Sequence, residues 1–136
     1  MGISRYYLEG HKFMLTKISG ELNDKNLMQH VIDLNKETKE VLNLRELADL
    51  REIKSLEKLT VQGTVNCSKA EENRPESLLA ILVPESNVVL YGMSRAYQMF
   101  SEDKRKDVQI FKDIYKALAW LSSDDYEILN NFVNNA

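Results

Sequence analysis

The sequence predicts an α/β fold, a mixed sheet of about five strands that opens with an antiparallel hairpin and is flanked by helices. From residue 20 onward, segments with apolar residues at helical spacing alternate with short apolar or β-branched runs, which is typical of strands joined by helices. Before residue 20, two short strand-like segments flank a glycine, as in a hairpin. Residues 78–83 are continuously apolar and stop at Pro84, which indicates a central strand covered on both faces.

The N-terminal part contains the predicted hairpin and the first helix. Residues 4–8 are rich in aromatic side chains, residues 12–18 alternate imperfectly between apolar and polar, and Gly10 lies in the turn between them. Asn23 or Asp24 can cap the helix that follows, because the side-chain oxygen accepts a hydrogen bond from a free backbone N–H. The buried stripe of that helix is formed by Leu27, Val31, Leu34 and Thr38.

The segment 40–59 admits two interpretations. It is dominated by Glu, Leu, Arg and Lys, whose intrinsic propensity favours one long helix. Residues 47–50 (Leu-Ala-Asp-Leu) equally fit a short buried strand with polar ends, because so short an apolar run has no diagnostic periodicity. Further on, the β-branched residues in 60–65 weaken a helix prediction, residues 67–73 favour one, and Pro75 marks a break.

The C-terminal half is predicted to alternate between helix and strand. A helix over 87–100 is followed by a solvated polar connection at 104–106 (Lys-Arg-Lys) and a strand at 108–111. Asp113 caps the next helix, and residues 124–136 can form a further amphipathic helix. The stripe of the 87–100 helix is formed by Val89, Met93, Ala96 and Phe100.

The composition fits one globular domain. The chain has 136 residues, 43% of them hydrophobic and 29% charged, so it can bury a core without a metal or a disulfide. The net charge of −3 argues against binding nucleic acid through phosphate attraction, and the single cysteine excludes a disulfide framework. The longest apolar run, 78–83, is far shorter than the roughly 20 residues of a membrane span. With no secretory signal in the sequence, we expect a cytoplasmic protein.

The predicted order of elements and three local motifs resemble the SpoIIAA-like branch of the STAS-related domains. Gly-Glu-Leu at 20–22 closes the second strand, and Ala-Asp-Leu-Arg at 48–51 is similar to a strand of that family that ends in an Asp-Leu-Arg-like sequence. The third match is the C-terminal half, from the apolar strand through Tyr-Gly-Met-Ser-Arg-Ala at 91–96 to Ala-Leu-Ala-Trp-Leu at 117–121. The resemblance covers nearly the whole chain up to residue 121.

The resemblance implies a secondary structure for residues 40–59, for which the residues alone allow either a helix or a strand, and for the stretch that follows them. It predicts a strand at 47–51 and a helix over about 56–73, in spite of the β-branched residues there. We therefore expect a STAS-like domain at residues 1–123, followed by an amphipathic helical tail at 124–136. The apolar stripe of that tail could pair two chains into a homodimer or fold back on its own sheet.

STAS domains of the anti-sigma-factor-antagonist type are non-catalytic and bind protein partners, so the resemblance implies a regulatory or protein-interaction domain of a bacterium, with no cofactor. The phosphorylatable serine of that family lies in an Asp-Ser-Ser-Gly-like turn after the strand that ends in Asp-Leu-Arg. Residues 53–60 carry no such motif, and Ser55 and Thr60 are the hydroxyl groups that a kinase could modify there. We expect a domain without the usual phosphoserine switch.

A set of polar and aromatic side chains near the predicted strand ends is the candidate binding site. Ligands of open α/β sheets bind outside the carboxyl ends of the strands. The set consists of Arg51, Tyr91, Arg95, Tyr97 and Lys112. Ordinary surface ion pairs are the alternative explanation of its charges. Besides a protein partner, the chain could bind a small or apolar, lipid-like ligand, an expectation that comes from fold-level likeness to lipid-binding CRAL-TRIO domains.

We expect neither an enzyme nor a metal site. Gly-Met-Ser-Arg-Ala at 92–96 resembles a nucleophile elbow, which makes a hydrolase using Ser94 the third hypothesis. Hydrolases of that type place their histidine after the serine, whereas His11 and His30 both precede it. We expect His11 to be solvated at a turn. His30 is expected to be half-exposed on its helix, where it and Asp33 provide too few ligands for a metal ion.

Overall fold

Five strands form a single mixed sheet in the computed structural model, which describes residues 2–136. The strands are β1 (Gly2–Leu8), β2 (Phe13–Glu21), β3 (Arg45–Ser55), β4 (Arg74–Leu82) and β5 (Arg105–Phe111), and they lie side by side in that order. β1 pairs antiparallel with β2, and the other three pairs are parallel. The predicted mixed α/β sheet with an N-terminal hairpin is therefore confirmed.

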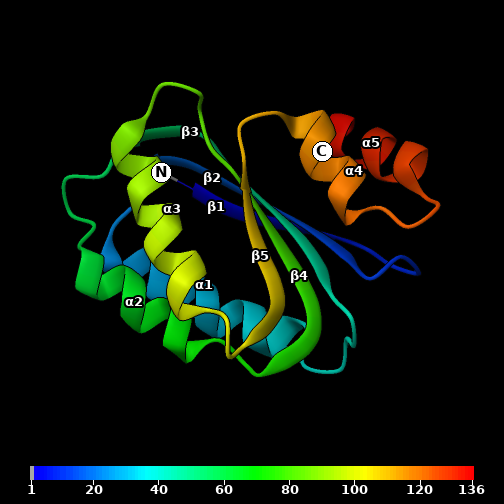
Figure 1. Cartoon of the computed structure of the whole chain (residues 1–136), viewed down its shortest axis with the longest axis horizontal. Coiled ribbons are helices and arrows are strands. Elements are labelled where there is room, and N and C mark those ends of the chain that lie inside the picture. The colour runs from blue at the N-terminus through cyan, green and yellow to red at the C-terminus, as the bar shows by residue number, and fades with distance from the viewer. Residues whose placement is uncertain (1) are drawn as a thin grey trace.

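Helices cover both faces of this sheet (Figure 1). α1 (Asp24–Glu37), α2 (Val61–Ala70) and α3 (Val88–Phe100) lie together on one face, whereas α4 (Ile114–Leu121) and α5 (Tyr126–Asn134) lie on the other. Among residues 2–136, none of these helices combines the length and the apolar character of a membrane span.

Alternation along the strands divides the apolar side chains between two cores. Leu15 of β2 and Leu47 of β3 face α4 and α5, and they pack there with Leu118 and Leu129. The residues on either side of them in the strands face α1, α2 and α3. The core on that face includes Ile18, Leu27, Leu50, Cys67, Ile81 and Leu90. Because both faces are covered, β4 is apolar on both sides, which accounts for the continuous run at 78–83.

The segment 40–59 contains the strand that the resemblance implied, but the bounds of its elements differ from the prediction. β3 is longer than the predicted 47–51, because its polar ends also pair with β2. α2 is shorter than the predicted 56–73, since Thr60 caps its first turn and Glu71 already has an extended backbone.

The predicted solvated connection at 104–106 is wrong for its central residue. Arg105 begins β5, and its side chain is completely buried. The prediction failed because the acidic residues next to it in the sequence are not its partners. Glu46 from β3 and Glu71 from the end of α2 bind it instead. These partners are distant in sequence, so local charge patterns cannot reveal them.

The C-terminal helix packs on the sheet of its own chain. Leu129 of α5 is fully buried in the core beneath α4 and α5, and the ring of Phe132 meets that of Phe13 edge-on, with centroids 6.1 Å apart. Asp125, which precedes α5, forms an ion pair of 2.8 Å with Arg45 of β3. The division of the chain at residue 123 stays a prediction.

Candidate functional site

The predicted binding residues do not gather into one site, and the two arginines lie apart. Arg51 forms a two-pronged ion pair with Asp49, with both nitrogen–oxygen distances at 3.0 Å. Asp49 lies two residues after Leu47 and so shares its face of the sheet, beneath α4 and α5. Arg95 is exposed on α3, which covers the other face, and it donates to Gln98 at 2.8 Å. The structure therefore does not bring the two arginines together.

The remaining three members of the predicted set occupy two different environments. Nζ of Lys112 lies 5.2 Å from the centroid of the exposed Tyr91 ring, a cation–π contact between the end of β5 and α3. Tyr97 turns inward from α3 and lines a cavity. Of the predicted set, Tyr97 is thus the member that lines a cavity.

The two predicted phosphorylation positions are already engaged by other groups. Thr60 caps α2: its hydroxyl accepts from the Gly63 N–H and donates to Asp24 Oδ2, each at 2.8 Å. The Thr60 N–H donates to Asp24 Oδ1, also at 2.8 Å. A phosphate on Thr60 would meet the Asp24 carboxylate at close range, and the like charges would repel each other. Ser55 accepts a long hydrogen bond of 3.4 Å from the Glu57 N–H. Modification of either residue stays a prediction.

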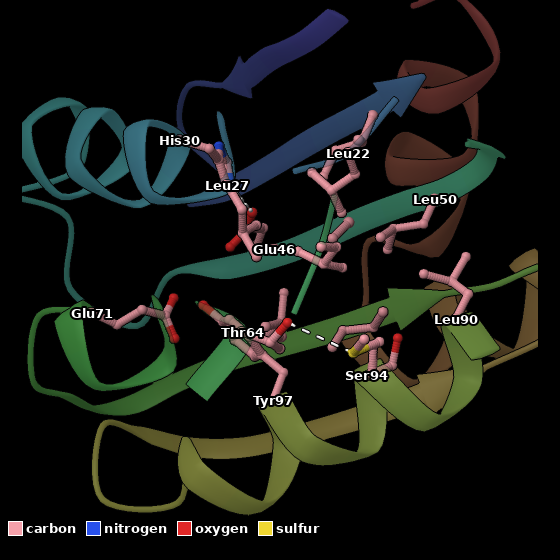
Figure 2. Close-up of a pocket in the computed structure, with 16 residues that line it drawn as sticks. Leu22, Leu27, His30, Glu46, Leu50, Thr64, Glu71, Leu90, Ser94 and Tyr97 are labelled. Atoms are coloured by element: carbon pink, nitrogen blue, oxygen red, sulfur yellow. Dashed lines mark hydrogen bonds and ion pairs between the residues drawn. The ribbon is translucent and has the colours of Figure 1, made fainter. Parts of the chain in front are cut away.

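A cavity of about 70 Å³ lies between the sheet and the helices α1, α2 and α3 (Figure 2). Most of its wall is apolar. The apolar lining comprises Ile18, Leu22, Leu27, Ala48, Leu50, Leu59, Leu79, Ile81, Leu90 and Met93. Polar side chains gather at the opposite end from Leu50 and Leu90, where His30, Glu46, Glu71 and Tyr97 lie. The cavity therefore has an apolar body and one polar end.

Arg105 holds two buried carboxylates together at the polar end. Its Nη2 donates to Oε1 of Glu46 and to Oε1 of Glu71, both at 2.8 Å, and the side chains of all three residues are at most 2% exposed. Burial alone would lower the pKa of Arg105, but the two carboxylates outweigh it and raise this pKa. Burial alone would also raise the pKa of Glu46, but the charge of Arg105, together with His30 and the hydrogen bonds from Thr16 and Arg105, outweighs it, and that pKa is lowered. Arg105 and Glu46 therefore remain charged in the core.

His30 is buried in this cluster, so the prediction of a half-exposed histidine is wrong. Its Nδ1 lies 3.2 Å from Nη1 of Arg5, and since arginine can only donate, Nδ1 is the acceptor. The ring proton is then on Nε2, which faces Oε2 of Glu46 at 3.8 Å. Burial lowers the pKa of His30, and the attraction of Glu46 does not make up for it. The neutral ring thus connects Arg5 of the edge strand β1 to the buried carboxylates.

Thr16 and Tyr97 complete the polar end. Thr16 Oγ1 donates to Oε2 of Glu46 at 2.7 Å. The Tyr97 side chain lies near the Glu71 carboxylate, and its burial, followed by the negative charge of Glu71, raises the pKa of Tyr97 well above the usual value. Within residues 2–136, Glu71 Oε2 is buried and has no hydrogen-bond partner. The Glu71 carboxylate therefore has one oxygen in use and one free.

Sequence reasoning missed most of this polar end, although weak signals for it exist. Thr16 and Glu46 are polar, whereas the positions two residues before and after each of them, on the same face of the strand, are apolar. A polar residue at such a position is an informative exception. His30 lies three residues after Leu27 and four before Leu34, so it belongs to the buried stripe of α1. None of these signals indicates Arg105 as the common partner.

A second polar cluster, on the other side of the sheet, corrects the prediction for His11. Its Nδ1 lies 3.0 Å from Oδ2 of Asp125, so His11 is not simply solvated at a turn. Asp125 also accepts from both terminal nitrogens of Arg45, at 3.0 and 2.8 Å. These hydrogen bonds from Arg45, more than the one from His11, lower the pKa of Asp125 well below its usual value. The cluster fastens the start of α5 to the hairpin and to β3.

Within residues 2–136, neither histidine is hydrogen-bonded to Ser94. It lies in the middle of α3, a regular helix capped by Asn87, rather than on the tight strand-to-helix turn of a nucleophile elbow. His30 faces Arg5 and Glu46, and His11 is bound to Asp125 on the opposite side of the sheet. In the described part of the chain, no three His, Cys, Asp or Glu side chains are grouped so that they could hold a metal ion.

Comparison with known proteins supports the fold. No protein-family model and no curated protein matches the chain. Among solved structures, it is similar to an uncharacterized protein of the DUF3478 family with a SpoIIAA-like fold, from Shewanella loihica PV-4. The TM-score is 0.54 and the sequence identity 16%, and the match covers 89% of this chain and 93% of that chain. At this identity the likeness shows the fold alone, and it confirms the predicted SpoIIAA-like architecture.

Proposed function

We propose that this SpoIIAA-like chain is a non-catalytic binding module that holds a small, largely apolar molecule in the cavity beneath α1, α2 and α3. The observation that supports it is the cavity itself, apolar over most of its wall and polar at one end. At about 24 cal/mol per Å³, a closed void of about 70 Å³ forfeits roughly 2 kcal/mol of packing energy, which is the upper limit for this cavity because it opens to the surface. A ligand that occupies the cavity recovers this energy, which favours a binding role.

The proposal is tested with n-hexanol, a neutral probe with an apolar chain and a polar end. We expect the backbone amide signals of the cavity lining to shift saturably in NMR titrations with this alcohol. Ala48, which lines the cavity, is replaced by Leu and, as a milder change, by Val, so that the added carbons occupy the space. Ala119 on the exposed side of α4 gives the matched control, Ala119→Leu.

We expect Ala48→Leu to weaken hexanol binding at least tenfold and Ala48→Val to weaken it less, while Ala119→Leu leaves it unchanged. Circular dichroism verifies that each variant is folded. Hexanol binding that is equally tight in the parent and in both folded Ala48 variants, or shifts that avoid the cavity lining, would contradict the proposed function.

The non-catalytic part of the proposal rests on the position of Ser94 within a regular helix, without a histidine partner. Hydrolysis of a short-chain acyl ester is compared between the parent and Ser94→Ala. We expect both to show the same residual turnover. A loss of turnover in Ser94→Ala alone would instead support the hydrolase hypothesis.

A regulatory domain that binds a protein is the second candidate function, and the outer face of α3 favours it. Val88 and Val89 at the start of this helix are 81% and 60% exposed, and Met99 near its end is 61% exposed. Exposed apolar groups of this size are common at interaction sites. The test is a pull-down with Met99→Glu and, as a matched control, Ile32→Glu on the exposed side of α1. A partner lost only by Met99→Glu supports this function, and one retained by every variant contradicts it.

A further inference from the structure

The polar end of the cavity contains a buried acceptor without a donor. Oε1 of Glu71 accepts from Nη2 and Nε of Arg105, at 2.8 and 3.2 Å, whereas Oε2 accepts from nothing in the described residues. The Glu71 side chain is 2% exposed, so bulk water does not satisfy this oxygen. A buried, unpaired oxygen of a carboxylate is unfavourable by more than an unpaired neutral group. The Tyr97 hydroxyl lies near the Glu71 carboxylate, but within residues 2–136 no donor forms a hydrogen bond with Oε2.

Charge around Glu71 favours a cation over a neutral donor. Glu71 caps the C-terminal end of α2, where the helix dipole is negative. Two carboxylates, Glu46 and Glu71, share the single buried guanidinium of Arg105. Arg5 directs its charge to Glu37 at the surface, and Arg74 donates to the Thr38 carbonyl outside the cavity lining. Arg74 is close enough for its charge to act on Glu71, and its Nε and Nη2 are themselves buried without hydrogen-bond partners. Among residues 2–136, however, no arginine pairs with Oε2 of Glu71.

The same groups disfavour an anionic head. The Arg105 nitrogens already donate to Glu46, to Glu71 and to the Leu78 carbonyl. The hydroxyl of Thr64 donates to the Thr60 carbonyl. The remaining hydroxyls at the cavity, on Ser94 and Tyr97, can accept as well as donate, so they suit an ammonium or a hydroxyl head equally.

The volume limits the apolar body of such a ligand. One water occupies about 10–15 Å³ on the scale on which this cavity measures about 70 Å³, so the cavity has room for roughly five to seven waters. A methylene group is similar in size to a water molecule. A body of about five to seven carbon atoms therefore fills the space between Glu71 and Leu90 (Figure 2).

We infer that the cavity takes a primary amine with a short apolar body, and that the ammonium group binds Oε2 of Glu71 while the body lies against the leucine-rich wall. This inference rests on the proposed function. It adds the chemical class of the ligand and names the residue that recognises it.

The experiment compares three probes of equal length, n-hexylamine, n-hexanol and hexanoate, by calorimetry and NMR at pH 7. We expect the amine to bind the parent chain at least tenfold more tightly than the alcohol, and hexanoate to bind most weakly. In Glu71→Gln the advantage of the amine over the alcohol is expected to disappear, with hexanol binding retained. The matched control Glu72→Gln, at the exposed neighbouring position, keeps the parent's order.

A measurement in the parent chain tests the inference even if the Glu71→Gln variant does not fold. The carboxyl carbon of Glu71 should shift in its ¹³C NMR signal on adding hexylamine and not on adding hexanol. If hexanol binds but the amine binds no more tightly, or if hexanoate binds most tightly, the inference is wrong and the proposed function stands. If none of the three probes binds the cavity, the proposed function fails and the inference fails with it.

Discussion

Arg105 is the residue on which the buried charges depend. Its side chain is fully buried and binds Glu46 and Glu71, so Arg105→Met leaves two carboxylates in the core without their cation. Removing one partner of a buried ion pair costs about 3–5 kcal/mol. We expect a loss of that size in the free energy of unfolding measured with urea. The control Lys106→Met removes an exposed cation 3.9 Å from Glu76 and should change stability by less than about 0.5 kcal/mol. Equal effects of the two substitutions would contradict this account of the core.

His30 should make stability depend on pH between about 7.5 and 5. Burial lowers its pKa in the folded chain below the ordinary value of 6.5. As pH falls through that value, the unfolded chain takes up a proton that the folded chain does not, so stability decreases. The lowered pKa of Asp125 acts in the same direction, but only near and below its ordinary value of 3.8. We expect urea midpoints of the parent to fall from pH 7.5 to pH 5 more than those of His30→Gln. Identical pH profiles for the two chains would contradict the buried, neutral state of His30.

The contact between α1 and α2 predicts an unusual response at a helical glycine. A Cβ at Gly63 would clash with the Asp24 carboxylate, which bridges the two helices by binding Thr60. Alanine is a better helix former than glycine by about 1 kcal/mol, yet Gly63→Ala displaces Asp24 and should destabilise the chain by about 1 kcal/mol. In an Asp24→Ala background the same substitution should stabilise it. Thermal unfolding of the double-mutant cycle measures this reversal, and purely additive effects would exclude the bridge.

At the level of elements, the sequence predicted what local patterns determine and missed what distant contacts determine. The helix over 87–100 and its cap follow from spacing and from the Asn87 side chain, and the structure agrees. The start of β5 was missed because Arg105 becomes acceptable in a strand only when Glu46 and Glu71 approach from elsewhere. The candidate site follows the same rule. Tyr97 was predicted, but the carboxylates that give it a chemical environment come from β3 and α2.

For the whole molecule, the decisive feature is that the sheet needs a layer on each face. α1, α2 and α3 leave room for a cavity on one face, whereas α4 and α5 seal the other with Leu118 and Leu129, both fully buried. The same strands carry the side chains of both layers, because successive residues of a strand point to opposite faces of the sheet. Glu46 and Leu47 are adjacent in β3 and point to opposite layers.

The chain ending at Ser123 should therefore lose stability even though it retains every residue of the cavity. Deletion of α5 exposes the groups that Leu129 covers and leaves Arg45 without Asp125.

Burial of Leu129 alone is worth about 2–5 kcal/mol, so Leu129→Ala should lower the free energy of unfolding by that amount. Ile128→Ala, at a position 47% exposed, should have a much smaller effect. Urea unfolding measures all three chains, and sedimentation should show self-association of the shortened one through its uncovered apolar face. If the shortened chain kept the urea midpoint of the parent and sedimented as a monomer, α5 would not be needed to complete the core of the sheet.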